Sequence, residues 1–252
     1  MKLDFYHYSY QCPLNDDMIR LLNEYRDKLD ICYHDITNDY KTAKELKMYF
    51  PTLVVLDNKE RYYSPINRAF LEKAVEGVYP RESAYIPSLS DRVVTKCIEP
   101  LNRNNIELAC KCCGNITQSN CCKKAEFLQT HMAEPYGFIH KDEGGHLIGG
   151  AEYLPSLIVP YDIPHDSKVA FITCVYLSDS EHDYKTAPLQ ALEQYLRSQF
   201  TKVIAITDEK GVFPNGDLEF FIRNGYKDEG IIFEDTNYCS LHLVSKSLTK
   251  NI

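Results

Sequence analysis

The stretch VAFITCVYLSDSEHDYKTAPLQALEQYLRSQF, residues 169–200, carries a strand signal, a loop signal and a helix signal in succession. Residues 169–178 form a nearly continuous apolar run, which is expected of a strand that is covered on both faces. Pro188 stands at a favoured first position of a helix. The apolar stripe that follows consists of Leu189, Leu192, Tyr195 and Leu196. Because this stripe has helical spacing, the sequence predicts a buried strand that leads through a polar loop into an amphipathic helix.

Strand and helix signals also surround this stretch from Asp91 to the end of the chain. The further strands are expected at 92–98, 136–141, 146–154, 202–207, 230–235 and 238–246, and the helices at 104–113, 120–132 and 216–225. The turn Asp142-Glu143-Gly144-Gly145 is a hairpin signal, and Gly225 is expected to end the last helix. This part of the chain is therefore expected to form a sheet with helices packed on it.

The first 80 residues alternate between strand and helix signals. Strands are expected at 2–10, 30–37, 52–57 and 61–64, and helices at 15–25, 40–50 and 67–77. The order is β-α-β-α-β-β-α. A tract rich in Pro and Ser follows between Pro80 and Ser90, which is typical of a linker. We therefore expect an α/β (α+β) protein with two domains, residues 1–85 and 86–252.

The composition excludes several classes of protein. The 252 residues are 44% hydrophobic and 25% charged, close to the averages for folded proteins, so disorder and fibrous repeats are excluded. The net charge is −8, and an acidic surface repels phosphate backbones, so no nucleic acid is expected as a partner. No apolar run approaches the roughly 20 residues of a membrane helix, and the first residues carry no export signal. We expect a cytoplasmic protein with no membrane partner, whose ten cysteines are reduced.

The first domain resembles the thioredoxin-like fold. In that family a cysteine lies between the first strand and the first helix, and Cys12-Pro13-Leu14-Asn15 stands at this place without the second cysteine. A helix N-terminus lowers the pKa of a thiol, so Cys12 is a candidate reactive thiol. The family also has a cis-proline before the third strand, which the resemblance places at Pro51 in Phe50-Pro51-Thr52. The alternative is that this fold serves as a binding or spacer module without redox turnover.

The second domain resembles the GNAT superfamily of acetyltransferases, and the YoaP-type in particular, which also pairs a GNAT module with a thioredoxin-like one. The stretches that carry the resemblance are Gly149-Gly150-Ala151-Glu152-Tyr153-Leu154-Pro155, Phe171-Ile172-Thr173-Cys174-Val175-Tyr176-Leu177 and Glu219-Phe220-Phe221-Ile222-Arg223-Asn224-Gly225-Tyr226. The resemblance implies a mixed, mostly antiparallel twisted sheet flanked by helices. It also implies an N-acetyltransferase that moves acetyl from acetyl-CoA to an amine.

In GNAT enzymes the pyrophosphate of coenzyme A binds backbone N–H groups of the loop after the fourth strand, at a helix N-terminus. The resemblance implies cofactor contacts from Val175, Tyr176, Leu177, His182, Asp183, Tyr184, Lys185, Thr186, Ala187 and Asn215. The family loop reads R/Q-x-x-G-x-G/A, and only Ala187 fits it well. His182 replaces Arg or Gln, Lys185 replaces a glycine, and Asp183 adds an unfavourable charge. Either Lys185 pairs with a phosphate, or the loop no longer binds the cofactor.

Acetyl transfer also needs a neutral amine. An amine with a pKa of about 10.4 is almost fully protonated at pH 7, so a group must take its proton. The resemblance places Glu152 beside the expected acetyl position, as the candidate base or amine-binding group; the alternative is a glutamate that points to solvent. A backbone N–H near Tyr176 is expected to polarise the acetyl carbonyl. Phe221 stands where many GNAT enzymes have a tyrosine acid, so the general acid is left unassigned.

Five cysteines cluster between the two expected helices at 104–113 and 120–132. They are Cys110, Cys112, Cys113, Cys121 and Cys122. Cys110 and Cys113 are expected on one helical face, and Cys121 and Cys122 in a first turn. The set Cys110, Cys113, Cys121 and Cys122 is thus a candidate metal site, although its spacing is not a standard zinc pattern. Buried thiols that fill a helix contact are the alternative.

The leading hypothesis is therefore an N-acetyltransferase that uses acetyl-CoA and acts on a small-molecule or peptide amine. An acidic protein with Glu152 and Asp183 near the acceptor channel suits a cationic amine. The alternative function is a non-catalytic protein that binds thiols or metals or senses redox state on a degenerate GNAT scaffold. The oligomeric state is open, with a homodimer as one option.

Overall fold

The computed structural model describes residues 1–9, 12–81, 84, 86, 90–110, 112, 122–176, 181–212 and 215–249. The chain divides into two compact units. The first comprises Met1–Ala84, Ile116–Phe127 and Pro160–Asp162, and the second comprises Tyr85–Asn115, Leu128–Val159 and Ile163–Ile252. In the described part of the chain, no helix has both the length and the apolar character needed to span a membrane.

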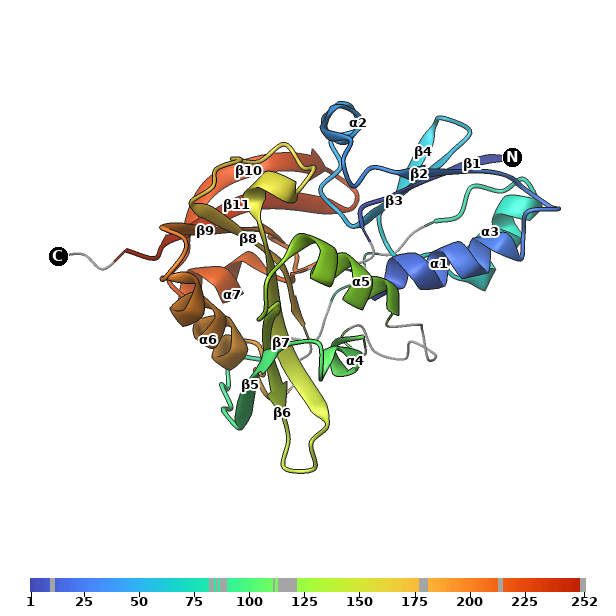
Figure 1. The fold of residues 1–252 in the computed structure, drawn as a ribbon. Coiled ribbons are helices and arrows are strands. Elements are labelled where there is room, and N and C mark those ends of the chain that lie inside the picture. Colours follow the sequence, from blue (N-terminus) through green and yellow to red (C-terminus); the bar gives the residue numbers. More distant parts are fainter. Residues whose placement is uncertain are drawn as a thin grey trace. The chain divides into compact units, whose positions relative to one another are not determined.

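A four-stranded sheet forms the centre of the first unit (Figure 1). Its elements are β1 (Lys2–His7), α1 (Pro13–Asn23), β2 (Asp30–Asp35), α2 (Tyr40–Glu45), β3 (Thr52–Leu56), β4 (Glu60–Tyr62) and α3 (Arg68–Val75). The strand order is β2-β1-β3-β4, with β1 and β2 parallel and the other pairs antiparallel. The predicted order β-α-β-α-β-β-α is confirmed.

The core of the first unit lies between this sheet and two helices. Leu3 and Phe5 of β1 share a buried cluster with Leu22 of α1 and Leu71 of α3. Because side chains alternate across a strand, Leu3 and Phe5 point to the same face, and α1 and α3 therefore cover that one face. The β3–β4 turn lies at Asp57 and Asn58, whose φ angles of 49° and 57° suit a tight hairpin.

The prediction of a cis peptide before Pro51 is wrong. The bond between Phe50 and Pro51 is trans, and the cis bond in the described residues precedes Pro135. In the trans form the Pro51 carbonyl accepts a hydrogen bond of 2.9 Å from the Tyr8 N–H. This bond extends the antiparallel pairing of β1 and β3 beyond the strand ends, so the backbone here follows the sheet.

A seven-stranded sheet forms the second unit. Its elements are β5 (Cys97–Leu101), α4 (Ile106–Ala109), α5 (Cys122–His131), β6 (Gly137–Lys141), β7 (Leu147–Pro155), a short 3₁₀ turn (Ser156–Ile158), β8 (Val169–Tyr176), α6 (Thr186–Leu196), β9 (Lys202–Asp208), α7 (Leu218–Arg223), β10 (Lys227–Asp235) and β11 (Cys239–Ser247), with the first half of α5 counted in the first unit. The strand order is β10-β11-β9-β8-β7-β6-β5. Only β8 and β9 are parallel among these pairs, which confirms the predicted mixed, mostly antiparallel sheet.

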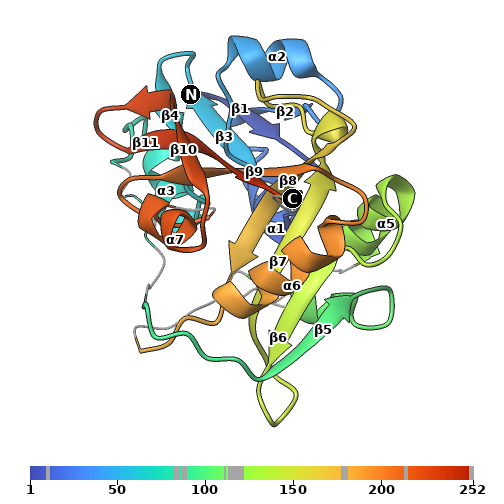
Figure 2. The same cartoon turned by 90° about the vertical axis from the view of Figure 1, so that its left-hand side faces the viewer.

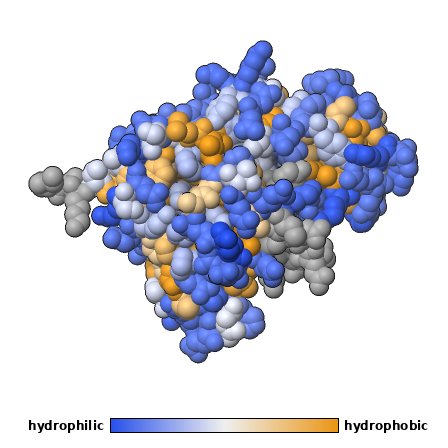
Figure 3. All heavy atoms as spheres, viewed as in Figure 1, coloured by the Kyte–Doolittle hydropathy of each residue, from blue (hydrophilic) through white to orange (hydrophobic). Residues whose placement is uncertain are grey.

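Helices cover both faces of this sheet. In Figure 1, α6 and α7 lie on one side of β7 and β8 and α4 lies on the other, and Figure 2 shows α6 crossing in front of β7. Leu189, Leu192 and Leu196 of α6 are buried against Ile172 and the neighbouring strands, as the predicted stripe requires. The face of the molecule viewed in Figure 3 is mainly hydrophilic, in keeping with the charge of −8.

Several elements begin or end differently from the prediction; in the first unit, for example, the helix expected at 40–50 ends at Glu45 and the strand expected at 2–10 ends at His7. The strand expected at 92–98 starts at Cys97 and continues through Pro100, which lies on the edge strand β5, where a missing N–H costs no ladder bond. Val93 instead forms an isolated bridge with Asp183. The helix expected at 104–113 ends at Ala109, with Cys110 as its C-terminal cap.

A buried histidine joins the strands at the far edge of this sheet. His242 of β11 contacts both Asp228 carboxylate oxygens through Nδ1, at 2.9 Å, and the Glu209 carboxylate through Nε2, at 3.1 Å. Burial lowers the pKa of His242, but the bonds to Asp228 and Glu209 offset this, and its pKa is raised. Burial alone would raise the pKa of Asp228. The hydrogen bonds that its carboxylate accepts from His242 and from the Gly230 N–H outweigh burial, and its pKa is lowered.

We expect the substitution His242→Gln to destabilise the protein more at pH 6 than at pH 9. Because the pKa of His242 is higher in the folded than in the unfolded protein, its contribution to stability is complete below the unfolded-state pKa of about 6.5. This contribution is lost as the pH rises through the folded-state pKa. Asp228 contributes above its unfolded value of about 3.9 and loses this as the pH falls. Urea unfolding is expected to show a loss of about 1 kcal/mol near pH 6. An equal loss at both pH values would contradict a charged His242.

Candidate active site

The parallel strands β8 and β9 part from each other within the second unit. Their pairing ends at Ile172 and Ala205, although both strands continue. Beyond this point the Asn215 side chain bridges the strands. Its Oδ1 accepts a bond of 3.0 Å from the Val175 N–H, and its Nδ2 donates one of 2.8 Å to the Ile206 carbonyl. Asn215 therefore replaces the missing ladder bonds and sets the separation of the two strands.

An extra residue in β8 changes which side chains at the end of this strand point to which face of the sheet. Glu152 of β7 is opposite Cys174, whereas the next residue, Tyr153, is opposite Ile172, so Thr173 has no partner in the register. This is a β-bulge, which reverses the alternation of side chains. As a result Ile172 and Val175 both belong to the core under α6. Cys174 and Tyr176 point to the other face, the face that carries Glu152.

Glu152 and Tyr176 form a buried polar pair on that face. Glu152 is 1% exposed, and Tyr176 is 4% exposed. The phenol lies over Gly150, where a Cβ atom would come 2.4 Å from the hydroxyl oxygen. Burial, and then the Glu152 carboxylate, raise the pKa of Tyr176 well above its usual range. The phenol therefore keeps its proton at neutral pH and lies within reach of the carboxylate.

The N-terminus of α6 is capped by a carboxylate of its own chain. Asp183 is 2% exposed, and its Oδ1 accepts bonds from the N–H groups of Lys185, at 2.8 Å, and Thr186, at 3.1 Å. Its Oδ2 accepts a bond of 2.6 Å from the Thr186 hydroxyl. An anion at a helix N-terminus is favourable because the N–H groups have no partner in the helix. At these two amides that anion is the Asp183 side chain.

The loop before α6 is held on both sides by backbone contacts. The Asp183 N–H donates to the Arg92 carbonyl at 2.8 Å, and the Val94 N–H donates to the Asp183 carbonyl at 3.1 Å. The next carbonyl, that of Tyr184, lies against Gly149 of β7, where a Cβ atom would come within 2.2 Å of the oxygen. The pair Gly149-Gly150 thus accommodates the loop backbone at one residue and the Tyr176 phenol at the other.

His140 of β6 holds this loop by a hydrogen bond to its backbone. Its Nε2 accepts the Lys96 N–H at 2.8 Å, so Nδ1 carries the proton and donates to the Tyr184 carbonyl at 3.1 Å. Burial lowers the pKa of His140, which favours this neutral form. Sequence reasoning did not single out His140 as a site residue, because a lone histidine in a strand has no spacing signal.

Lys185 does not extend into solvent. Its side chain is buried, and Nζ lies 5.7 Å from the centre of the Phe220 ring of α7. Burial lowers the pKa of Lys185. A cation over an aromatic ring is stabilised by the ring quadrupole, so the ammonium has a favourable place within the unit. A pairing of Lys185 with a phosphate requires this side chain to leave the ring.

The structure brings together part of the residues predicted for cofactor binding. Val175 and Asn215 share a hydrogen bond, and residues 183–187 form the cap and first turn of α6, while Leu177 lies outside the described residues. The rings of His182 and Tyr184 stack at 5.6 Å. Phe221 is fully buried against Tyr226 in the core. Phe221, at the position where the resemblance implies a tyrosine, is therefore a packing residue.

The cysteine cluster is described only in part. Cys110 and Cys112 are buried, Cys113 and Cys121 lie outside the described residues, and Cys122 begins α5 with its side chain undescribed. Cys110 is disulfide-bonded, which corrects the prediction that all thiols are reduced. Within the ranges that the structure describes, no group of three or more His, Cys, Asp or Glu side chains is placed to hold a metal ion.

Cys12 lies at the start of α1 in the first unit and is half-buried. Asn15, at the position of the missing second cysteine, is fully buried. Its Nδ2 donates to the carbonyls of Tyr8, at 2.9 Å, and Ser9, at 2.7 Å. This amide ties the end of β1 to α1. The place of a resolving thiol is thus taken by a side chain that satisfies backbone carbonyls.

Comparisons with known proteins give similar folds at low identity. An aminoglycoside 6'-N-acetyltransferase from Enterococcus faecium is 15% identical over 62% of this chain and 99% of its own, with a TM-score of 0.44. An aminoglycoside 6'-N-acetyltransferase complexed with coenzyme A is 14% identical over 62% of this chain and 99% of its own, with a TM-score of 0.43. The spermidine/spermine N-acetyltransferase SpeG from Vibrio cholerae is 13% identical over 61% of this chain and 93% of its own, with a TM-score of 0.42. No family model and no curated protein matches the chain. These TM-scores lie below 0.5, so the fold is defined by the strand order and the register of the two sheets.

Proposed function

We propose that the second unit is a GNAT-type N-acetyltransferase that transfers acetyl from acetyl-CoA to an amine. The observation that carries the proposal is the parting of β8 and β9 beside the buried Glu152. Parallel strands that separate leave backbone groups facing the gap, and a ligand at the carboxyl end of such strands can contact both. A buried carboxylate on the neighbouring strand supplies a proton acceptor next to that gap.

The fit of the residues to acetyl-CoA differs between the two ends of the cofactor. The proposal places the acyl end where β8 and β9 part, next to the face that carries Glu152 and Tyr176. In that gap the Asn215 side chain already bonds to the Val175 N–H and the Ile206 carbonyl, so the acyl end has to lie beside this side chain or displace it. The phosphate end does not fit as the loop stands, since Asp183 already accepts from the Lys185 and Thr186 amides. A phosphate can bind these amides only after the carboxylate has moved, so the proposal places the polyphosphate contact in a rearranged loop.

In the proposed reaction Glu152 prepares the amine. Bound acetyl-CoA supplies an activated thioester carbonyl. The Glu152 carboxylate would hold the incoming ammonium group and take its proton, a step that costs roughly 4–5 kcal/mol for an amine of pKa about 10.4 at pH 7. The C–N bond would then form as the C–S bond of the thioester breaks, and coenzyme A would leave as its thiolate or, once protonated, as its thiol. The Tyr176 hydroxyl, whose pKa is raised, keeps its proton on the same face as the carboxylate. The burial of both groups excludes water from their contact.

The finer assignments rest on the resemblance and are part of the same proposal. Residues 1–85 are a thioredoxin-like domain, and residues 86–252 are a GNAT domain of the YoaP-type in a cytoplasmic protein. The acceptor is a small cationic amine, which the net charge of −8 favours. The amide of Asn15 at the place of a second cysteine supports a binding or spacer role for the first domain over redox turnover at Cys12.

A second candidate function follows from the Asp183 cap. If that carboxylate never leaves the α6 amides, the second unit is a scaffold that does not use coenzyme A. The burial of Lys185 over Phe220 favours the same interpretation, because both charged groups of the loop already have partners inside the unit. In that case the function lies with the thiols, including the half-buried Cys12.

Titration calorimetry with acetyl-CoA separates the two candidates. We expect the wild-type protein to bind at micromolar concentration and Asp183→Asn to bind about tenfold more tightly, because the substitution removes the charge that competes with phosphate. Asp166→Asn is the matched control, since Asp166 also accepts a backbone N–H, that of Lys168, but at an exposed turn. The control is expected to leave affinity unchanged. If neither the wild type nor Asp183→Asn binds, the acetyltransferase proposal is wrong.

A further inference from the structure

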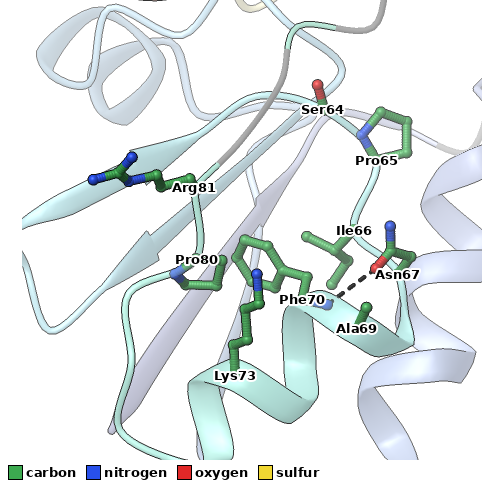
Figure 4. Close-up of a pocket in the computed structure, with 9 residues that line it drawn as sticks. All are labelled: Ser64, Pro65, Ile66, Asn67, Ala69, Phe70, Lys73, Pro80 and Arg81. Carbon is green, nitrogen blue, oxygen red and sulfur yellow. Dashed lines mark hydrogen bonds between the residues drawn. The ribbon is translucent and has the colours of Figure 1, made fainter.

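The first unit contains a pocket that the proposed reaction does not use. It has a volume of about 300 Å³, at the lower end for small-molecule sites. Figure 4 shows it between one face of α3 and the segment that returns after this helix. All the lining residues lie within the first unit: Ser64, Pro65, Ile66, Asn67, Ala69, Phe70, Lys73, Pro80 and Arg81. The pocket therefore lies entirely within the first unit.

The walls of the pocket combine an apolar floor with a cationic rim. Ile66 and Pro80 are buried, and the half-buried Phe70 ring lies beside them. Lys73 and Arg81 are exposed. Figure 4 shows Lys73 rising past the Phe70 ring, and Arg81 on the returning segment with its guanidinium pointing away from that ring. The lining contains two cations and no carboxylate.

The two cations are without acidic partners. Within the described residues, neither Lys73 nor Arg81 takes part in an ion pair, a hydrogen bond of its side chain or a ring contact. Other exposed cations of the first unit do, for example Arg68 with Glu24 and Arg20 with Asp16. An anion that binds at this rim would pair with cations that have no acidic partner among the described residues.

We propose that this pocket binds a small ligand that joins an anionic group, a carboxylate or a phosphate, to an apolar ring or chain. The anion pairs with Lys73 beside the Phe70 ring, and the Arg81 side chain reaches it by turning from the returning segment, since a guanidinium binds a planar or tetrahedral oxyanion with two hydrogen bonds. The apolar part lies against Ile66 and Phe70. The site is independent of acetyl transfer, because every residue that lines it belongs to the first unit.

The test uses benzoate and phenyl phosphate, which carry one aromatic ring and either anion, on the full-length protein. Binding is followed by NMR titration, with benzamide as the uncharged equivalent and inorganic phosphate as the anion alone. We expect benzoate or phenyl phosphate to bind with a dissociation constant of about 1 mM or below, and at least tenfold more tightly than benzamide or phosphate. The stronger of the two anions identifies the carboxylate or the phosphate as the natural group.

The variant Lys73→Gln/Arg81→Gln is expected to weaken binding at least tenfold, because it removes both charges at exposed positions without touching the core. The matched control is Lys41→Gln/Lys59→Gln, which removes two exposed cations of the same unit away from the pocket. Benzamide binding as tightly as benzoate would overturn the proposal, as would the absence of binding by both aromatic anions. An equal loss in the control variant would reduce the effect to general charge attraction and would overturn it as well.

Discussion

Glu152→Gln is expected to lower kcat/KM for amine acetylation about 10²–10⁴-fold, the usual contribution of a positioned general base. The carboxylate is 1% exposed and faces Tyr176 across the β7–β8 pair, so no bulk water stands in for it. Glutamine keeps the shape and the hydrogen-bonding capacity on one side but takes no proton. The measurement is the initial rate of acetyl-CoA consumption with a polyamine acceptor between pH 6 and pH 9.

The pH profile distinguishes a base from a packing residue. The loss of rate in Glu152→Gln is expected to be largest at pH 6 and to shrink toward pH 9, because the free amine, with a pKa near 10.4, itself loses its proton more often as the pH rises. Glu107→Gln on α4, at an exposed position, is the matched control and is expected to behave as wild type. A variant with an unchanged profile and rate would rule out Glu152 as the base.

Gly149→Ala is expected to destabilise the second unit by about 3 kcal/mol or more. A Cβ atom there would stand 2.2 Å from the Tyr184 carbonyl oxygen and 2.9 Å from its carbon, and both are backbone atoms. That carbonyl is held by His140, and the preceding residue, Asp183, is bonded on both sides of its backbone. The loop therefore cannot move away without loss of several hydrogen bonds. Urea unfolding followed by far-UV circular dichroism measures the effect.

Gly150→Ala is the informative companion of this substitution. At Gly150 the added methyl meets the Tyr176 ring, a side chain, so Tyr176→Ala is expected to restore part of the lost stability. At Gly149 the obstacle is backbone, so Tyr184→Ala is expected to restore none of it. Double-mutant cycles give the two coupling energies. Rescue of Gly149→Ala by Tyr184→Ala would show that the loop backbone is not the obstacle.

The Asp183 cap connects stability with ligand binding. A carboxylate cap of this kind contributes about 1 kcal/mol to a helix, and the same groups that it satisfies are those that a phosphate would use. Any phosphate that binds the Lys185 and Thr186 amides must therefore supply at least this free energy before it gains affinity. Because Asp183 is also bonded through its backbone to Arg92 and Val94, its side chain has to rotate while its main chain stays in place.

Much of the fold was predictable from local patterns. The strand-loop-helix at 169–200, the β6–β7 hairpin and the order β-α-β-α-β-β-α follow from periodicity and turn residues that are near one another in the chain. Local patterns also explain the failures. The helix expected at 104–113 ends at Ala109, with Cys110 as its cap. The cis bond expected at Pro51 was taken from a resemblance, whereas the bond is trans and the Pro51 carbonyl accepts from the Tyr8 N–H.

The sequence by itself determined the order of the strands and helices and the approximate place of most of them. The resemblance that it carries implied a mixed, mostly antiparallel sheet, with Glu152 and residues 182–187 as site residues. Only the tertiary structure decided what these residues do to one another. The bulge at Thr173 places Tyr176 beside Glu152, Asp183 turns back onto the α6 amides, and Lys185 packs on Phe220. Such contacts depend on strand register and on residues far apart in the chain, and neither is encoded in the spacing of neighbouring side chains.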